Sequence, residues 1–307
     1  MTARETREPD ISVTIAGVKL RSPVIAASGT FGFGADYEGL LDIASLGAIC
    51  TKGLTLHARA GNTGQRIHET PAGMMNSIGL ENPGIPVFLE RELPRMRALG
   101  PAIIANLSGS TLEEYSGGAR LLDVSGIDMI EINISCPNVE SGGMAFGLCP
   151  ADAAAVTRHV RQAAPGKPLM VKLSPNAPDL AAVAQACVSA GADAISLVNT
   201  FKAAAIDIAK RAPVFANVSA GLSGPCIRPI ALRMVWELFD VVDVPIVGMG
   251  GIACASDALE FLLAGAAAVQ VGSATFAHPP AMNEIAAGIK DYIGERGFSC
   301  IKELSIR

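Results

Sequence analysis

The chain has 307 residues, of which 50% are hydrophobic and 17% charged, and its net charge of −5 goes with a pI near 5.5. This composition supports one large α/β core, and an acidic balance without a Lys/Arg block argues against a nucleic-acid or anionic-membrane surface. The seven cysteines form no CxxC pair, which indicates reduced thiols in a cytoplasmic protein. The four histidines form no i,i+4 pair either, so we expect no metal site.

The N-terminal residues, MTARETREPD, are charged and lack the apolar segment of a secretory signal, so we expect a flexible tail over residues 1–10. Two short apolar runs follow, Val13–Ile15 and Val18–Leu20, and the Ala16-Gly17 pair between them predicts a hairpin that closes the bottom of the fold. The longest uncharged stretch, residues 261–283, is interrupted by glycines and a Pro-Pro pair, so no membrane-spanning helix is expected.

Eight short apolar runs then recur along the chain, each ending near Gly, Ser, Asn or Lys. They are Val24–Ala27, Ala48–Thr51, Ala102–Ala105, Met129–Ile132, Leu169–Val171, Ala194–Val198, Pro245–Val247 and Ala268–Val271. Such runs are typical of strands that are buried on both faces of a parallel sheet. Helix-like stretches between them, such as Asp179–Ala190 and Ser256–Ala264, begin at acidic caps and stop at glycine.

This repeated alternation predicts an α/β fold, a single (β/α)8 TIM barrel over residues 11–307 without a second domain. The linker between the second and third strands is long and rich in Gly and Pro, which predicts an insertion over the active site.

Polar residues stand where the predicted strands end. In chain order they are Ser28, Lys52, Asn106, Asn133 with Cys136, Lys172, Asn199, Gly250 and Gly272. The carboxyl ends of barrel strands share one mouth, where active sites of this fold lie. A strand-end cap explains any one of these residues alone, but two lysines at one apolar mouth would be costly without an anionic ligand.

The seventh and eighth units are rich in glycine, which lets backbone N–H groups approach an anion, and barrels often bind phosphate there. The segment Gly248-Met-Gly-Gly-Ile-Ala253 also matches the loose dinucleotide pattern G-x-G-x-x-A. A dinucleotide site would place an acid about 20 residues later, whereas the next strand ends Gln270-Val-Gly-Ser. We therefore favour phosphate binding over direct NAD binding.

Cys136 follows a predicted strand and is flanked by Asn133 and Asn138, so we expect its thiol at the barrel mouth. An ordinary thiol pKa of about 8.5 means that it would act through activation or transient deprotonation. Cys50, inside a predicted strand, and Cys187, on an Ala-rich predicted helix, are expected to be structural.

Several motifs then resemble one family. They are Ser28-Gly-Thr-Phe-Gly-Phe-Gly, Asn76-Ser-Ile-Gly-Leu-Glu-Asn-Pro-Gly, Asn133-Ile-Ser-Cys-Pro-Asn, Val171-Lys-Leu-Ser-Pro-Asn, Val198-Asn-Thr, Gly221-Leu-Ser-Gly-Pro and Gly248-Met-Gly-Gly-Ile. From about residue 11 to residue 280 the chain resembles class 1B dihydroorotate dehydrogenase, with the motifs in family order. The departures are Gly53, where a hydroxyl residue is common, and Ala220, where glycine is frequent.

The resemblance implies a site for FMN and a site for dihydroorotate or orotate. FMN would be held by Ser28, Lys52, Gly53, Asn106, Asn133, Lys172, Val198, Gly224, Gly250, Gly251, Gly272 and Ser273. The pyrimidine would contact Lys52, Asn76, Ser77, Ile78, Gly79, Leu80, Asn133, Asn199 and Thr200, with Asn138 in addition. Cys136 would act as the catalytic base that takes the C5 proton, while C6 gives hydride to flavin N5.

The resemblance also implies a pathway role and a partner. The reaction would be the oxidation of dihydroorotate to orotate in UMP biosynthesis, with electrons passed to NAD+ by a second subunit that carries FAD and a 2Fe–2S cluster. The resemblance further implies that two copies of this chain form a homodimer within a heterotetramer that includes the partner subunits. The alternatives are a fumarate-dependent dihydroorotate dehydrogenase, a flavoenzyme resembling dihydropyrimidine (uracil or thymine) dehydrogenase, and a non-catalytic barrel that binds a phosphorylated ligand.

Overall fold

The computed structural model describes residues 8–135 and 146–306 and contains a closed barrel of eight parallel strands. The strands are β3 (Val24–Ala26), β4 (Ala48–Cys50), β7 (Ala102–Leu107), β8 (Met129–Asn133), β9 (Leu169–Lys172), β10 (Ala194–Leu197), β15 (Ile246–Met249) and β16 (Ala268–Val271). They pair in chain order, and β16 returns to β3 with Val271 opposite Ala26. The predicted (β/α)8 barrel and its eight strands are confirmed, with bounds that shift by one or two residues.

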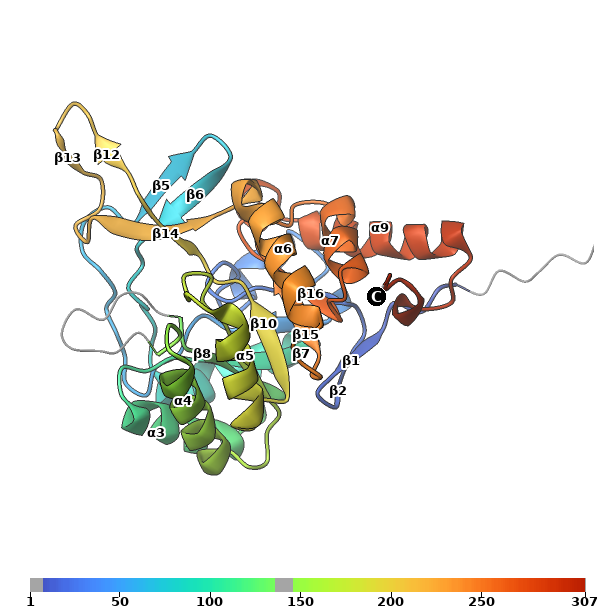
Figure 1. Cartoon of the computed structure of the whole chain (residues 1–307), viewed down its shortest axis with the longest axis horizontal. Coiled ribbons are helices and arrows are strands. Elements are labelled where there is room, and N and C mark those ends of the chain that lie inside the picture. The colour runs from blue at the N-terminus through green and yellow to red at the C-terminus, as the bar shows by residue number, and fades with distance from the viewer. Residues whose placement is uncertain (1–7, 136–145, 307) are drawn as a thin grey trace, which may run out of the picture.

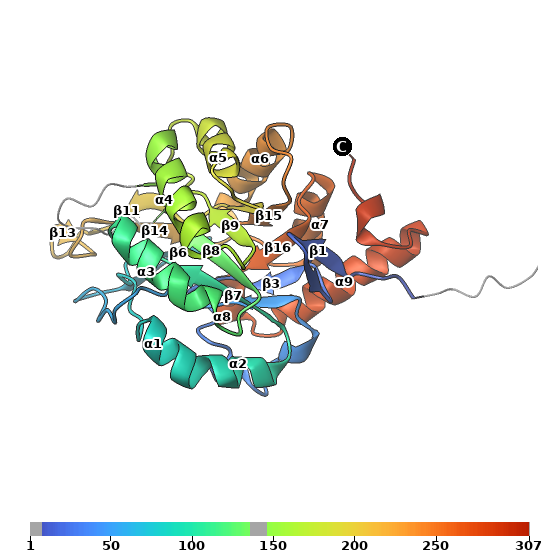
Figure 2. The ribbon, with the colours of Figure 1, turned by 90° about the horizontal axis from the view of Figure 1, so that it is seen from below.

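Helices surround the strands on the outside of the barrel (Figure 2). They are α1 (Ile85–Val87), α2 (Leu93–Leu99), α3 (Leu112–Asp123), α4 (Pro150–Ala163), α5 (Leu180–Ser189), α6 (Arg228–Phe239), α7 (Ala255–Leu263), α8 (Ala274–Ala277) and α9 (Ala281–Arg296), with a π-helical turn η3 (Phe88–Glu92). After β3 the chain forms only 3-10 turns, η1 (Ala35–Tyr37) and η2 (Ile43–Ser45), within the described residues 27–47. Helix α9 packs against β3 and α7 instead, so the last helix covers the first strand.

The helix ends follow from local capping chemistry. Asp179 caps α5, because its carboxylate accepts a hydrogen bond from Ala182 N (2.9 Å). Helix α7 begins one residue before its predicted start, because Asp257 reaches back to the backbone N–H groups of Ala253 and Cys254 (2.9 and 3.3 Å). Both predicted helices are present.

The predicted hairpin is also present, as β1 (Val13–Ile15) and β2 (Val18–Leu20) in register. Its turn residues Ala16 and Gly17 have positive φ values of 47° and 84°, the backbone that tight hairpins require. Ile15 and Leu20 are 1% exposed and share a small apolar cavity with the barrel residues Ile25, Ile104 and Met170. The hairpin therefore closes the bottom of the barrel.

The opposite end carries a four-stranded antiparallel sheet built from two insertions (Figure 1). The insertion after the second barrel strand, which the sequence predicts, contributes β5 (Ile67–Thr70) and β6 (Gly73–Asn76). A second insertion after the sixth barrel strand, which we did not predict, contributes β11 (Phe201–Ala204) and β14 (Ser219–Ser223), with a small ribbon of β12 (Ile206–Asp207) and β13 (Ala212–Pro213). Strands β6 and β14 pair, with Asn76 opposite Gly221.

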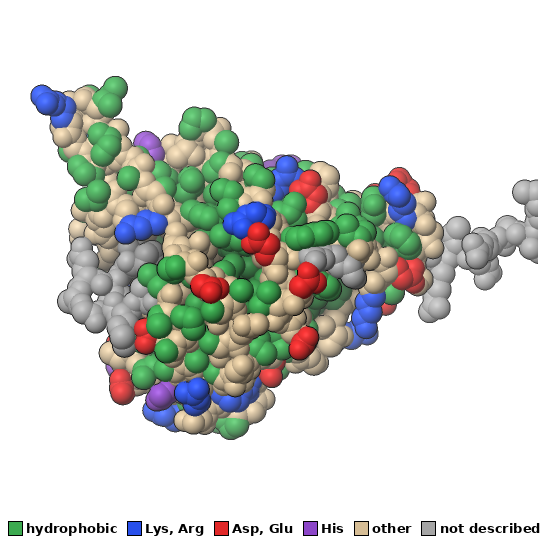
Figure 3. Space-filling model, in the orientation of Figure 1, with side chains coloured by type: hydrophobic (Ala, Val, Ile, Leu, Met, Phe, Trp, Pro, Cys, Tyr) green, Lys and Arg blue, Asp and Glu red, His purple; other side chains and the backbone are tan. Residues whose placement is uncertain are grey.

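The remaining turns are η4 (Pro225–Ile227) before α6 and η5 (Ile301–Glu303) near the C-terminus. Residues 8–10 contact the body of the protein, where Lys290 Nζ donates to Glu8 Oε2 (2.7 Å) and Asp10 pairs with Cys300. On the face shown in Figure 3, acidic and basic side chains are scattered rather than gathered by sign. Among the described residues, no helix combines the length and the apolar character that crossing a bilayer requires.

Candidate active site

A cavity of about 420 Å3 opens at the carboxyl ends of the barrel strands and is bordered by the four-stranded sheet. Most of the residues that the sequence singles out line it together. They are Ser28, Lys52, Gly53, Asn76, Ile78, Gly79, Leu80, Asn133, Lys172, Val198, Asn199, Thr200, Gly224, Gly250, Gly251, Gly272 and Ser273. Its volume lies within the range of small-molecule and cofactor pockets, roughly 300–1,000 Å3.

Of the other predicted site residues, two do not line the cavity and two lie outside the part of the chain that the structure describes. Asn106 lies within β7, is fully buried and contacts Asn133 from behind. Ser77 is 3% exposed, and its Oγ accepts a hydrogen bond from Asn62 Nδ2 (3.0 Å). Cys136 and Asn138 lie outside the described residues.

Glycine loops form one end of the cavity. Gly250 and Gly251 have φ values of 125° and 76°, in the region that favours glycine. A Cβ on Gly251 would lie 2.7 Å from Gly224 O, and one on Gly250 would lie 2.7 Å from Ala231 Cβ. Glycine is therefore needed for the loop to pack on its protein neighbours, and because both residues line the cavity, their backbone groups are available to bind an anion.

Two lysines line the cavity. Lys172 is the last residue of β9 and only 6% exposed, and Lys52 follows β4. No carboxylate of the described residues lies within 4.0 Å of either ammonium group. Because burying a cation without a partner is costly, the cavity is suited to an anionic ligand.

A buried carboxylate lies directly behind the cavity lining. Glu131 is fully buried within β8. Its Oε2 accepts hydrogen bonds from Asn106 Nδ2 (2.6 Å) and Cys50 Sγ (3.2 Å). Its Oε1 accepts from Gln270 Nε2 (2.7 Å) and Ser196 Oγ (2.8 Å). The donors come from β7, β4, β16 and β10, so one carboxylate joins strands on several sides of the barrel.

The surroundings of Glu131 favour its charged form. Burial alone would raise the pKa of this carboxyl. The positive charge of Lys172 and the hydrogen bonds from Gln270, Cys50 and Ser196 lower it by more, so the pKa lies below its ordinary value of 4.5. Burial and the charge of Glu131 raise the pKa of the Cys50 thiol well above 9.0. Glu131 is therefore ionised at neutral pH, and Cys50 stays protonated as a donor.

A chain of amides leads from Glu131 to the cavity. Asn106 Oδ1 accepts a hydrogen bond from Asn133 Nδ2 (3.3 Å), and Asn133 Oδ1 accepts from Asn199 Nδ2 (3.3 Å). Asn199 Oδ1 in turn accepts from Thr200 N (2.8 Å). Ser135 Oγ also donates to Asn133 Oδ1 (2.9 Å) and contacts Asn199 Nδ2. Each amide therefore has a defined orientation.

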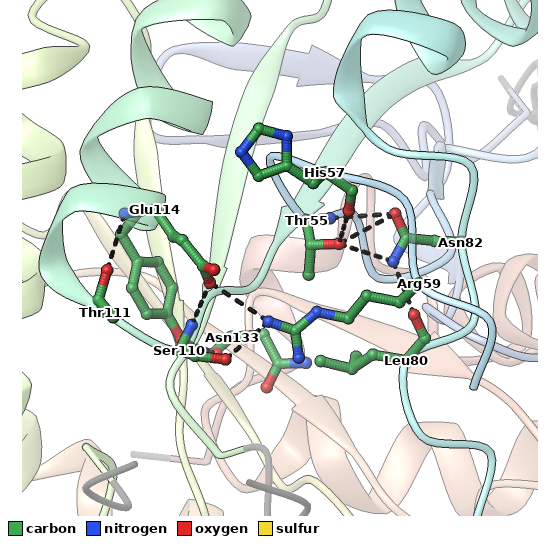
Figure 4. Close-up of polar contacts among 10 residues, drawn as sticks. Thr55, His57, Arg59, Leu80, Asn82, Ser110, Thr111, Glu114 and Asn133 are labelled. Carbon is green, nitrogen blue, oxygen red and sulfur yellow. Dashed lines mark hydrogen bonds and ion pairs between the residues drawn. The ribbon is translucent and has the colours of Figure 1, made fainter. Parts of the chain in front are cut away.

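The loop of residues 76–80 is held by Asn82 (Figure 4). Gly79 and Leu80 have positive φ values of 76° and 55°, so the loop turns sharply here. Asn82 Nδ2 donates to Leu80 O (2.6 Å) and to Thr55 Oγ1 (2.9 Å), and Asn82 Oδ1 accepts from Gly84 N (2.9 Å). One asparagine, 6% exposed, thus joins the loop to the segment after β4.

A second contact holds the same insertion to the barrel (Figure 4). Arg59 pairs with Asn82 through the backbone, and its Nη2 donates to Ser110 Oγ (2.6 Å) and to Glu114 Oε2 (3.2 Å) at the start of α3. The next residue of α3, Tyr115, donates from its Oη to Asn133 O (2.8 Å). These bonds connect the loop, α3 and the amide chain.

Sequence reasoning missed Glu131, Gln270 and Asn82 as parts of this site. For Glu131 a signal was present, because a charged residue in the middle of an apolar strand run must have partners in the core. For Gln270 the equivalent signal is an amide within Ala-Val-Gln-Val. Asn82 carried no comparable local signal, since asparagine is ordinary in a loop.

Comparison with known proteins agrees with this geometry. Residues 10–293 match the family model described as dihydroorotate dehydrogenase. The chain is 54% identical over 298 residues to the "Dihydroorotate dehydrogenase B (NAD(+)), catalytic subunit" of Geotalea daltonii, covering 97% of both chains. It is 55% identical over 295 residues to the protein of the same name from Petrotoga mobilis, covering 96% of this chain and 98% of the relative. The chain therefore belongs to the dihydroorotate dehydrogenase family.

Proposed function

We propose that this chain is the FMN-binding catalytic subunit of a class 1B dihydroorotate dehydrogenase. It oxidises dihydroorotate to orotate in pyrimidine biosynthesis. The observation that carries this function is the cavity at the barrel mouth, which is lined by Lys52, Lys172 and oriented amides, and where neither ammonium group has a described carboxylate within 4.0 Å. A cationic and amide-lined cavity suits a planar ring that bears a carboxylate and alternating C=O and N–H edges.

The residues present fit FMN. Gln270 lines the cavity, and its buried Oε1 lacks a hydrogen-bond partner among the described residues, so a donor on a ligand would satisfy it. Gly250 and Gly251 would hold the phosphate through their backbone, together with Gly224, Gly272 and Ser273. Lys172 would neutralise the charge that the ring system gains on reduction. When bound, FMN supplies the acceptor for the hydride.

The other lining residues would bind and orient the pyrimidine. Lys52 would pair with its carboxylate, while the loop of residues 76–80 and Asn133, Asn199 and Thr200 would contact the ring, with Asn138 in addition. Cys136 is our candidate for the base that removes the C5 proton. Ser28, Gly53 and Val198, which also line the cavity, would contact FMN, and Asn106 would act through Asn133.

We further propose that residues 11–307 form one FMN-binding domain after a short tail, and that a second subunit carries FAD and a 2Fe–2S cluster. The two relatives described above are named as catalytic subunits of NAD+-dependent enzymes, which supports NAD+ as the final acceptor. A homodimer of this chain within a heterotetramer follows from the same proposal.

The test is anaerobic titration of the purified holoenzyme with dihydroorotate and, separately, with dihydrouracil. We expect a yellow protein whose flavin is bleached by dihydroorotate and not by dihydrouracil, because only the former has a carboxylate for Lys52. Turnover with NAD+ and not with fumarate is expected after co-purification with the partner. A colourless protein, or reduction by dihydrouracil alone, would contradict the proposal.

A further inference from the structure

The proposed chemistry does not use Glu131, although it is a fully buried carboxylate beside the cavity. Ionised carboxylates are rarely retained in a core unless their partners are also needed, because desolvation is costly and well-packed apolar residues are often as stable. Two donors meet each Glu131 oxygen, at 2.6 and 3.2 Å on Oε2 and at 2.7 and 2.8 Å on Oε1. A carboxylate has about four acceptor positions, so its capacity is filled.

Because every acceptor position of Glu131 is occupied by a donor, this carboxylate fixes which way the neighbouring amide groups point. Asn106 and Gln270 must turn their NH2 groups toward Glu131, since the carboxylate only accepts. Asn106 Oδ1 then faces Asn133 Nδ2, and the same polarity continues to Asn199. Gln270 Oε1 is left on the other side as a buried acceptor in a residue that lines the cavity.

The same carboxylate places a fixed negative charge near the cavity. Lys172, whose side chain lines the cavity, is the cation whose charge acts on Glu131. Charges interact strongly where water is excluded, so a negative charge here disfavours the gain of negative charge by a bound ligand. Glu131 thus opposes part of the effect of Lys172 and Lys52 on the cavity.

We propose that Glu131 is a positioning residue that orients the amide of Gln270 directly, and that of Asn133 through Asn106, toward the cavity, and that it lowers the reduction potential of the bound flavin. The inference rests on the proposed binding of FMN in this cavity. It assigns a function to a charged group that sequence reasoning treated as part of a strand.

The test is Glu131→Gln, which keeps the shape but replaces one acceptor oxygen by an NH2 group and removes the charge. That NH2 group would face donors, so Gln270 or Asn106 must turn over. We expect the midpoint potential of bound FMN to rise by about 30 mV, which for a two-electron couple equals a tenfold change in the underlying equilibrium. Orotate binding, followed by the change in the flavin absorption spectrum, should weaken on the order of tenfold.

Ser196→Ala is the matched control, because it removes one hydrogen bond to the same carboxylate and keeps the charge. It should leave the flavin potential at the wild-type value. Glu131→Asp, which retains the charge, should have a flavin potential closer to that of the wild type than to that of Glu131→Gln. A wild-type potential together with wild-type orotate affinity in Glu131→Gln would overturn the assignment of Glu131.

If Glu131→Gln gives no folded protein, Asn106→Ala decides, because it interrupts the amide chain and keeps the carboxylate. Weaker orotate binding with FMN retained would support the positioning role, and wild-type orotate binding would refute it. These outcomes are separate from the proposed function. A wild-type protein that lacks FMN or is not reduced by dihydroorotate refutes that function, whatever Glu131→Gln does.

Discussion

At the scale of single residues, the cysteines divide by their surroundings. Cys50 and Cys187 are fully buried. Burial raises the pKa of the Cys187 thiol to about 11, partly offset by a hydrogen bond with Thr157, and burial and Glu131 raise the pKa of Cys50 well above its ordinary value. Since thiolates and not thiols react with alkylating reagents, both should be inert in the folded protein, as their expected structural role requires.

We therefore predict that N-ethylmaleimide at pH 8 modifies the exposed Cys149, Cys226 and Cys254 and leaves Cys50 and Cys187 unmodified. Peptide mass spectrometry of the native protein measures this, with urea-unfolded protein as the control in which all of them react. Rapid modification of Cys187 in the native state would show that its helix opens more readily than the packing indicates.

The proposed base is tested by Cys136→Ala. Because a general base contributes roughly 10²–10⁴-fold, flavin reduction by dihydroorotate should slow by about this factor in stopped-flow absorbance, while FMN content is retained. Cys149→Ala is the matched control, since the exposed Cys149 side chain makes no capping hydrogen bond at the start of α4, and it should react at the wild-type rate. Wild-type reduction in Cys136→Ala would assign the proton transfer to another group.

At the scale of elements, the loop of residues 76–80 depends on Asn82. Asn82→Ala removes bonds to Leu80 O, Thr55 Oγ1 and Gly84 N and leaves buried groups unpaired, which costs about 1–3 kcal/mol for each unsatisfied group. Because the loop also contacts the proposed substrate position, we expect the KM for dihydroorotate to rise on the order of tenfold, with a smaller change in kcat. Steady-state kinetics with the co-purified partner measures the two separately.

Asn283 provides the matched control for this variant. It holds a different turn through three hydrogen bonds. Asn283 Oδ1 accepts from Asp42 N (2.9 Å), and Asn283 Nδ2 donates to Asp42 O (3.0 Å) and Ser45 Oγ (2.7 Å). Asn283→Ala should lower the free energy of unfolding in urea and leave the KM unchanged. An equal rise in KM for both variants would mean that loss of stability alone, and not the loop, explains the effect.

The barrel strands could be predicted because each is a short apolar run buried on both faces, and the shared mouth then followed from the fold. Strands β11 and β14 could not. The run Phe-Lys-Ala-Ala of β11 is half-buried and weakly apolar, and β14 pairs with β6, whose residue Asn76 lies 145 positions before Gly221. The contacts of Asn82 with Leu80 and Gly84 are local, but its contact with Thr55, 27 residues earlier, depends on how the insertion folds back on the barrel and is seen only in the folded chain.

At the scale of the whole molecule, stability in acid should depend on Glu131. Other carboxylates with lowered pKa values, such as Glu81 beside Arg66 and Asp207 beside Lys210, are only partly buried, so solvent screens their contribution. Glu131 differs because it is fully buried and holds four donors from four strands. Its protonation would therefore affect the barrel as a unit.

The direction of the pH effect follows from linkage. The folded-state pKa of Glu131 lies below the ordinary value of 4.5, so the unfolded chain binds its proton more readily than the folded protein does. The stabilisation that this carboxylate contributes is fully present above about pH 4.5 and is lost as the pH falls through the folded-state pKa. We predict that the free energy of unfolding in urea falls below pH 4.5 for the wild type and falls less for Glu131→Gln, which has no proton to bind at this position. Ser196→Ala, which keeps the carboxylate but removes one of the bonds that lower its pKa, should retain most of the wild-type pH dependence. Parallel curves for the wild type and Glu131→Gln would mean that Glu131 has the same pKa in the folded and unfolded states, which would refute the lowered folded-state pKa that we assign to it.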